Sequence, residues 1–253
     1  MTAPSPASRP TELDRLVANT RTLEARGSRA LDLRLVAAYA ILRDARLPLS
    51  RRQAAARSIQ LASAQLLTNQ AWRASALSAL QPADRASLQA MLEAGDELGA
   101  MGDPSDSLPN WRIAAPPPSA ALLDHYHEAE RASGIPWQYL AAINLVETAM
   151  GRIHGLSVAG AQGPMQFMPQ TWEGYGRGDI NDPRDSILAA ARYLRARGGP
   201  ADMDGALYGY NQSHHYVRAI DIFANQVAAD PDAFLLYYSW QVLVPTTSGP
   251  ALL

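Results

Sequence analysis

Residues 155–169, GLSVAGAQGPMQFMP, are the stretch of this 253-residue chain that says most about its fold. The segment holds too many glycines for a helix, and its Met and Phe side chains are too apolar for a solvated tether. Glycine allows positive φ angles and a close approach of the backbone to a ligand. We therefore predict an ordered loop that lines a binding site.

The helical segment before this loop ends in LVETAMG, residues 145–151, and contains one acid among apolar side chains. A glutamate at a helix end is most often a solvated carboxylate. Here the carbonyl dipoles of the helix end and an apolar surround would both disfavour the ionised form of Glu147. A carboxyl with a raised pKa can act as a general acid at neutral pH. The sequence thus predicts a protonated Glu147 beside the loop.

The loop and the residues after it combine neutral polar groups with apolar ones. Neutral amides and hydroxyls beside hydrophobic side chains suit a sugar with N-acetyl groups better than a phosphate or a metal ion. Trp172 and Tyr175 follow the loop directly and are expected to stack on sugar rings. The predicted substrate-binding residues of this region are Ser157, Gln162, Met165, Gln166, Phe167, Met168, Trp172 and Tyr175.

Three blocks of sequence together resemble the lytic transglycosylases with a goose-lysozyme-like fold, in particular their membrane-bound murein branch. The blocks are Glu147-Thr148, the run SVAGAQGPMQFMPQTW at 157–172 and ALYGYN at 206–211. In that family a catalytic Glu, usually followed by Ser, precedes a Ser-x-x-Gly-Ala-x-Gly-x-Met-Gln loop and a downstream Tyr-Asn motif. This chain departs from the pattern at Thr148, and at Ser213 where the family has Gly.

The resemblance implies an all-α fold, with a lysozyme-like helical catalytic domain preceded by a helical accessory region. It makes Glu147 the single acid/base and Ser157 a neighbour of its carboxyl. It also makes Tyr210 a hydroxyl near the reaction centre and Asn211 a residue that positions the cleft. The implied reaction cleaves the β-1,4 bond between N-acetylmuramic acid and N-acetylglucosamine in peptidoglycan and closes a 1,6-anhydro ring. No cofactor or metal is implied.

Two alternatives stay open. A hydrolytic muramidase would need a second carboxylate, from Asp179, Asp182 or Asp185, to hold a water opposite Glu147. We favour a structural role for these three: Asp182 as a helix cap, Asp185 beside the positive helix end, and Asp179 in a loop. The second alternative is a non-catalytic glycan-binding protein on the same fold.

The composition limits the classes of function. The net charge is −2, which gives no field that favours nucleic acid. There is no cysteine, so disulfides and thiol catalysis are excluded. The start of the chain lacks the apolar core of an export signal, and no apolar run reaches the length of a membrane span. The predicted partner is a peptidoglycan strand, so we expect the protein to act outside the cytoplasm, in peripheral association with the envelope. We also expect a monomer.

Helical periodicity and Pro- and Gly-rich breaks indicate how the chain is organised. A helix is expected to stop at Gly134, the next to begin at Pro136, and another to begin at Asp182-Pro183. The last predicted helix runs through Val244. The predicted divisions are a disordered segment at 1–10, a helical accessory region at 11–100, a Pro-rich linker or strap at 101–118, a lysozyme-like transglycosylase domain at 119–244 and a loose tail at 245–253.

Overall fold

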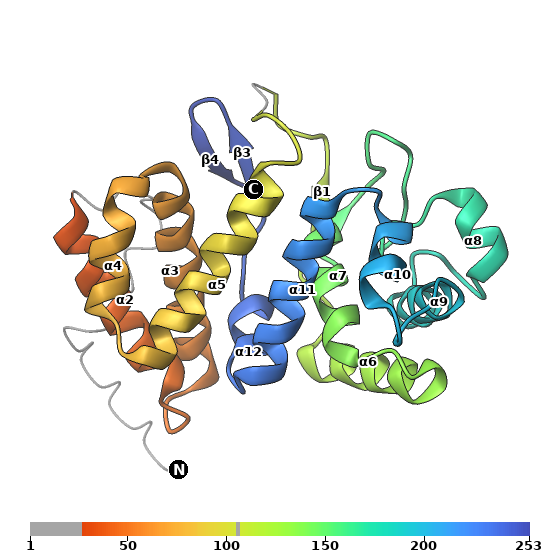
Figure 1. The fold of residues 1–253 in the computed structure, drawn as a ribbon, viewed down its shortest axis with the longest axis horizontal. Coiled ribbons are helices and arrows are strands. Elements are labelled where there is room, and N and C mark those ends of the chain that lie inside the picture. Colours follow the sequence, from red (N-terminus) through yellow and green to blue (C-terminus); the bar gives the residue numbers. More distant parts are fainter. Residues whose placement is uncertain (1–26, 105–106) are drawn as a thin grey trace, which may run out of the picture. The chain divides into compact units, whose positions relative to one another are not determined.

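The fold is that of a computed structural model, which describes residues 27–104 and 107–253. Helices make up most of these ranges, and the strands form short antiparallel pairs (Figure 1). This confirms the predicted all-α class. Residues 1–10, predicted to be disordered, lie outside the described residues, as does the start of the predicted accessory region.

Backbone contacts divide the chain into a first unit that ends at Arg85 and a second unit that begins at Ala86. In the first unit, α2 packs against α3 and α4 through fully buried leucine and alanine side chains. Small alanines allow the helices to approach closely. The described helices of this unit are α2 (Ser28–Arg43), α3 (Leu49–Thr68), η1 (Gln70–Trp72), α4 (Arg73–Ala79) and the first residues of α5 (Pro82–Gly99).

The second unit contains the predicted site and is built around α7 (Trp137–Thr148), which packs against α6, α9 and α11 (Figure 1). Its remaining elements are β1 (Arg112–Ile113), α6 (Ser119–Ser133), β2 (Ile153–His154), α8 (Pro169–Tyr175), α9 (Pro183–Ala196), α10 (Met203–Tyr210), α11 (His214–Ala229), α12 (Ala233–Tyr238), β3 (Leu243–Thr246) and β4 (Gly249–Leu252). Because α7 is apolar on most of its circumference, it forms the centre of this unit's core.

Local sequence explains where the helices around α7 begin and end. Gly134 follows α6 with a φ of 78°, a conformation that favours glycine, and Pro136 is the N-cap of α7. The Asp182 side chain accepts a hydrogen bond from the Asp185 amide at the start of α9, with Pro183 in the first helical position. The predicted cap at Asp182 is therefore confirmed.

The observed division of the chain differs from the boundary predicted at 101–118. Most of α5 belongs to the second unit, where Gln226 of α11 donates a hydrogen bond of 2.7 Å to the buried Ser87 hydroxyl. The following segment lies along the same unit, since β1 pairs with β2 and the Tyr238 hydroxyl donates to the Pro117 carbonyl at 3.0 Å. The sequence shows that α5 is amphipathic, but it does not show which helices pack against its apolar face. The boundary could therefore not be predicted.

The C-terminal segment also differs from its prediction. The last helix ends at Tyr238, not near Val244, and the residues predicted to be loose form the β3–β4 hairpin. Alternate side chains, Val242 and Val244, are buried, and Gly249 has a φ of 109° directly after the turn. This period of two and a glycine at the turn are the pattern of a strand pair.

Candidate active site

Glu147 is the penultimate residue of α7, and the backbone turns sharply just after it. Ala149, Met150 and Gly151 have positive φ angles of 50°, 64° and 81°. The sequence predicted that the helix stops at Gly151, but the left-handed run begins two residues earlier. Such angles cost roughly 1–2 kcal/mol at a residue with a side chain, so the surrounding structure must hold this turn in place.

The residue after the acid, Thr148, joins α7 to the glycine-rich loop. Its hydroxyl donates to the Pro164 carbonyl at 2.7 Å and accepts from the Gly151 amide at 3.1 Å. The Asn144 amide donates to the same Pro164 carbonyl at 2.9 Å, and the Tyr126 hydroxyl donates to Asn144 Oδ1 at 2.7 Å. The Tyr126, Asn144 and Thr148 side chains are fully buried. These bonds fix the loop against the helix that carries the acid.

The loop 155–169 folds back on itself in a short turn. Gln162 and Phe167 exchange two backbone hydrogen bonds of 2.9 and 2.8 Å, and Gly163 and Gln166 between them have positive φ angles of 74° and 48°. A Cβ atom at Gly163 would lie 2.0 Å from the carbonyl oxygen of Ile180. Glycine is therefore required at this position by both its backbone angle and its close approach to a neighbouring segment.

The Glu147 carboxyl is half-buried and has one hydrogen-bond partner among the described residues. The Tyr216 hydroxyl, from the first turn of α11, donates to Glu147 Oε1 at 2.7 Å. Burial raises the pKa of Glu147 to about 7, although the bond from Tyr216 acts in the opposite direction. This side chain can therefore both give and take a proton near neutral pH. Sequence analysis did not single out Tyr216, because an aromatic residue on an amphipathic helix usually belongs to the core.

The polar residues predicted to lie near the acid are not hydrogen-bonded to its carboxyl. The Tyr210 hydroxyl donates to the Met165 carbonyl of the loop at 2.6 Å, and the charge of Glu147 helps to raise the pKa of Tyr210. Asn211 follows α10 directly and is half-buried. The Ser157 hydroxyl accepts from the Ala161 amide at 2.9 Å, so it stabilises its own loop. The hydroxyl bonded to the carboxyl is that of Tyr216, where the resemblance had implied Ser157.

Two residues predicted to bind substrate are buried in the core. Met165 is 0% exposed and Phe167 is 2% exposed. The Phe167 ring makes edge contacts with Trp172, Tyr193 and Tyr210, at centroid distances of 5.5–6.4 Å. The turn of the loop directs these two side chains inward, because the adjacent positive φ angles reverse the chain. They support the loop and present no surface to a sugar.

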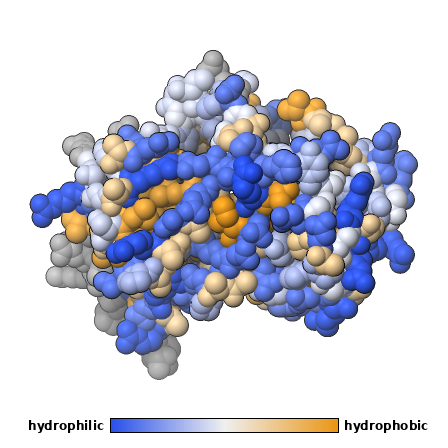
Figure 2. Space-filling view, viewed as in Figure 1, coloured by the Kyte–Doolittle hydropathy of each residue, from blue (hydrophilic) through white to orange (hydrophobic). Residues whose placement is uncertain are grey.

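Other predicted substrate-binding residues keep contact with solvent. Met168 is 44% exposed, and Gln162, Gln166, Trp172 and Tyr175 are half-buried. Leu156 and Val158 in the same loop are also exposed, and the apolar patch at the upper right of Figure 2 lies over this segment. The loop thus presents polar and apolar groups together on its outer side, as expected of a surface that contacts sugars.

The three aspartates that could supply a second carboxylate are bonded to nearby backbone. Asp182 caps α9, and Asp185 accepts from the Asp179 amide at 3.0 Å. Asp179 in turn accepts from the Asn181 amide at 2.9 Å. These bonds agree with the structural roles that the sequence favoured. Each of the three carboxylates thus accepts a backbone hydrogen bond within the 179–185 segment, and within the described ranges none of them is hydrogen-bonded to Glu147.

Within the described ranges, no cluster of His, Asp or Glu has the arrangement of a metal site. Likewise, no helix of these ranges is long and apolar enough to cross a membrane.

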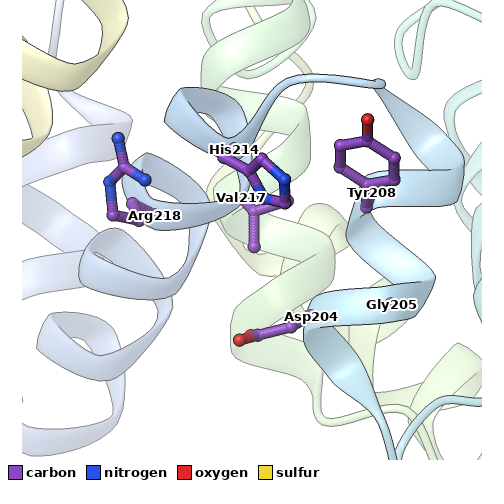
Figure 3. Close-up of a pocket in the computed structure, with 6 residues that line it drawn as sticks. All are labelled: Asp204, Gly205, Tyr208, His214, Val217 and Arg218. Atoms are coloured by element: carbon purple, nitrogen blue, oxygen red, sulfur yellow. The ribbon is translucent and has the colours of Figure 1, made fainter.

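A separate groove lies between α10 and α11, with a volume of about 420 Å³ (Figure 3). The Tyr208 and His214 rings stack at its rim, with centroids 4.7 Å apart. Glu147 and the Tyr210-Asn211 pair are not among its lining residues, so it is distinct from the surroundings of the acid. The groove is lined by Asp204, Gly205, Tyr208, His214, Val217 and Arg218.

Comparison with known proteins gives a family match over the segment that holds these features. Residues 124–222 match the model of the transglycosylase SLT domain. The chain is also similar to two proteins named membrane-bound lytic murein transglycosylase F. The one from Thiobacillus denitrificans is 33% identical over 121 residues, which are 45% of this chain and 26% of the relative. The one from Nitrosospira multiformis is 32% identical over 122 residues, 45% of this chain and 25% of the relative.

The chain thus spans about a quarter of the length of these curated relatives. No solved structure matches it.

Proposed function

We propose that this chain is a peptidoglycan lytic transglycosylase, because residues 124–222 match the model of the transglycosylase SLT domain, as the three sequence blocks predicted. The observation that carries the proposal is Glu147, a half-buried acid whose pKa is raised to about 7 beside an ordered glycine-rich loop. The names of the two relatives, both murein transglycosylases, support the same substrate.

In the first step, Glu147 donates its proton to the glycosidic oxygen between N-acetylmuramic acid and N-acetylglucosamine, and the bond from that oxygen to the muramyl C1 breaks. A carboxyl with a pKa near 7 is protonated in a large fraction of molecules at neutral pH, which suits this step. The acetamido group of the substrate stabilises the positive charge at C1, as in glycosidases that lack a second protein carboxylate.

In the second step, the Glu147 carboxylate takes the proton of the muramyl 6-hydroxyl, whose oxygen forms a bond to C1. The product is a 1,6-anhydro ring, the acid is regenerated, and no water is consumed. One carboxyl performs both steps. The local hydrogen bonds of Asp179, Asp182 and Asp185 support this one-carboxyl scheme, because an inverting muramidase needs a free second carboxylate to activate water.

The site residues follow from the same proposal. Tyr210 acts close to the acid, whose charge affects its pKa, and Asn211 positions the cleft. The outer side of the loop and of α8 contacts the glycan through Gln162, Gln166, Met168, Trp172 and Tyr175. The substrate places the reaction outside the cytoplasmic membrane, so we also propose extracytoplasmic action, with the envelope polymer as the partner.

The test compares purified wild-type protein with Glu147→Gln on intact sacculi, with mass spectrometry of the released fragments. We expect anhydro-muramyl ends from the wild type and a loss of release of about 10³-fold in the variant. Glu93→Gln, a change at an exposed glutamate of α5, serves as the matched control and should release fragments at the normal rate.

Each alternative has its own signature in this experiment. Reducing ends heavier by one water would identify a hydrolytic muramidase. Unchanged release by Glu147→Gln would remove the acid from its role. Binding of glycan without release by the wild-type protein would identify a non-catalytic sugar-binding protein.

A further inference from the structure

The groove between α10 and α11 is lined by these two helices and is distinct from the surroundings of Glu147 (Figure 3). Its volume of about 420 Å³ lies in the range typical of small-ligand sites, about 300–1,000 Å³. We propose that this groove is a second, non-catalytic glycan site, which binds neutral N-acetylhexosamine units of the polymer that the active site cleaves. The choice of polymer rests on the proposed function.

One face of each helix builds the groove. The lining residues of α10 follow the first of them by one and four positions, and those of α11 by three and four, so each set lies on one side of its helix. Gly205 adds no side chain to the α10 wall. A Cβ atom there would collide with the carboxylate of Asp202, the N-cap residue, which accepts from the Gly205 amide at 2.9 Å. The cap of α10 therefore requires this glycine, which also keeps the groove open.

Tyr208 and His214 give the groove a flat aromatic surface. Tyr208 is 40% exposed, and its ring stacks on that of His214 with an angle of 26° between the planes. Val217, which is 6% exposed, adds an apolar contact from α11. The C–H groups on one face of a pyranose ring are apolar and pack against an aromatic face of this kind. The groove thus offers a sugar ring a surface on which to stack.

The polar atoms at the groove are available to a ligand. Figure 3 shows the Asp204 carboxylate pointing from α10 into the space between the two helices. Among the described residues, Asp204, Tyr208 and His214 find no hydrogen-bond partner for their side chains. A carboxylate accepts hydrogen bonds from hydroxyls, and a phenol or a neutral imidazole can both donate and accept. These are the groups that sugar hydroxyls and an acetamido group require.

The charges around the groove favour a neutral ligand. Arg218 donates two hydrogen bonds of 2.7 Å to Glu97, which offsets its charge. Burial, the hydrogen bond to Asp221 and the charges of Asp221 and Asp204 raise the pKa of Tyr139, so both carboxylates act on one region beside the groove. A negative field repels phosphate polymers and the free carboxylates of peptides. An uncharged N-acetylglucosamine unit meets no such repulsion.

The chain connects the groove closely to the proposed active site. Tyr208 lies two residues before Tyr210, and His214 lies three residues after Asn211. A polymer held in the groove would therefore keep a high effective concentration near the active site after each cut. The second site should increase the affinity for long, multivalent glycan and leave the chemical step unchanged.

The test compares the wild type with Tyr208→Ala on intact sacculi and on a short soluble peptidoglycan tetrasaccharide. We expect Tyr208→Ala to raise the KM on sacculi about 3- to 10-fold with an unchanged kcat, and to leave both constants on the tetrasaccharide unchanged. Leu33→Ala, at an apolar residue of α2 that is 55% exposed, is the matched control and should behave as the wild type. A wild-type KM on sacculi in Tyr208→Ala would overturn the proposal.

Two further variants test the chemistry of the ligand. Tyr208→Phe keeps the aromatic ring and should retain most of the affinity for sacculi. Asp204→Asn removes a charge, and it should weaken sacculus binding about 2- to 3-fold because an amide is a weaker acceptor. Asp124→Asn, at an exposed aspartate of α6, controls for the loss of one charge. Tighter binding in Asp204→Asn would identify an anionic ligand and contradict the neutral sugar.

A direct binding measurement needs no change in the groove and no turnover. Glu147→Gln is titrated with the tetramer of N-acetylglucosamine, and NMR follows the His214 ring signals, assigned with His214→Gln. We expect these signals to shift with a saturable dependence on the sugar. Unmoved His214 signals would refute this inference alone, whereas normal fragment release by Glu147→Gln would refute the proposed function itself.

Discussion

Two glutamates contact the first turns of α11, and their pKa values move in opposite directions. Glu97 of α5 accepts from Arg218 and lies 2.6 Å from His215 Nδ1, and these hydrogen bonds lower its pKa to about 2. Glu147 of α7 accepts from Tyr216, and burial raises its pKa to about 7. The neighbours of the two acids are thus adjacent residues of one helix, His215 and Tyr216.

The comparison separates the effect of the helix end from that of the surroundings. Both glutamates lie in the last turn of their helices, so the carbonyl dipoles act on both in the same direction. Opposite shifts must come from what else touches each carboxyl. Glu97 accepts hydrogen bonds from the charged guanidinium of Arg218, whereas Glu147 accepts one from the neutral phenol of Tyr216 and burial raises its pKa. The dipole that the sequence suggested as one cause is therefore the lesser one.

The largest expected effect on stability is that of Glu147→Gln. Because the folded pKa of Glu147 is raised above 4.5, the wild-type protein loses stability relative to the variant as the pH rises from about 4.5 through about 7. The variant should therefore have a higher free energy of unfolding than the wild type, by a small amount at pH 4.5 and by at most about 3 kcal/mol at pH 8. Urea denaturation at both pH values measures it. An equal effect at both pH values would show that burial does not oppose the charge.

The next effect tests how the end of α7 is held against the loop. Thr148→Val keeps the shape of the side chain but removes the hydroxyl that binds Pro164 and the Gly151 amide. The cost should be about 2 kcal/mol, since a buried amide loses its acceptor. Thr148→Ser, the residue usual in the family, should retain most of the stability and activity. Equal thermal denaturation curves for the Val and Ser variants would contradict the role of the hydroxyl.

The smallest effect on stability is expected from Glu97→Gln. Unlike Glu147→Gln, this change should lower the stability of the protein at neutral pH. The folded pKa of Glu97 is depressed, so its charged form stabilises the protein above about pH 4.5, and this contribution is lost as the pH falls toward about 2. The variant should therefore unfold at a slightly lower temperature at pH 7, by an amount that shrinks in high salt. A salt-independent difference would mean that the contact acts through packing. Calorimetry at low and high salt distinguishes the two.

Much of the fold was predictable because local signals agreed with the tertiary structure. Gly134 and the Asp182-Pro183 pair mark helix ends through backbone angles and capping, which depend on neighbouring residues only. The end of α12 and the C-terminal hairpin were not predicted, because residues 239–244 contain no glycine or proline and their apolar side chains fit a helix and a strand equally well. Only the burial of Val242 and Val244 on one side decides between them.

For the candidate site, the sequence placed the acid and the loop but not the contacts between them. Tyr216 lies 69 residues from Glu147, and no spacing rule connects an acid on one helix to a phenol on another. Thr148 was noted only as a departure from the family, although its hydroxyl forms the bonds expected of a structural link. Met165 and Phe167 were assigned to substrate because the direction of a side chain in a loop depends on φ angles that composition does not give.

The hydrogen bond from Thr148 to the Pro164 carbonyl joins the end of α7 to the loop, so that the two form one rigid unit. A protein designer who transfers this acid to another scaffold would have to transfer residues 126, 144, 148 and 164 with it. Without them, the C-terminal turn of the helix would have no side-chain hydrogen bonds to the loop, and the loop would not be fixed beside the acid.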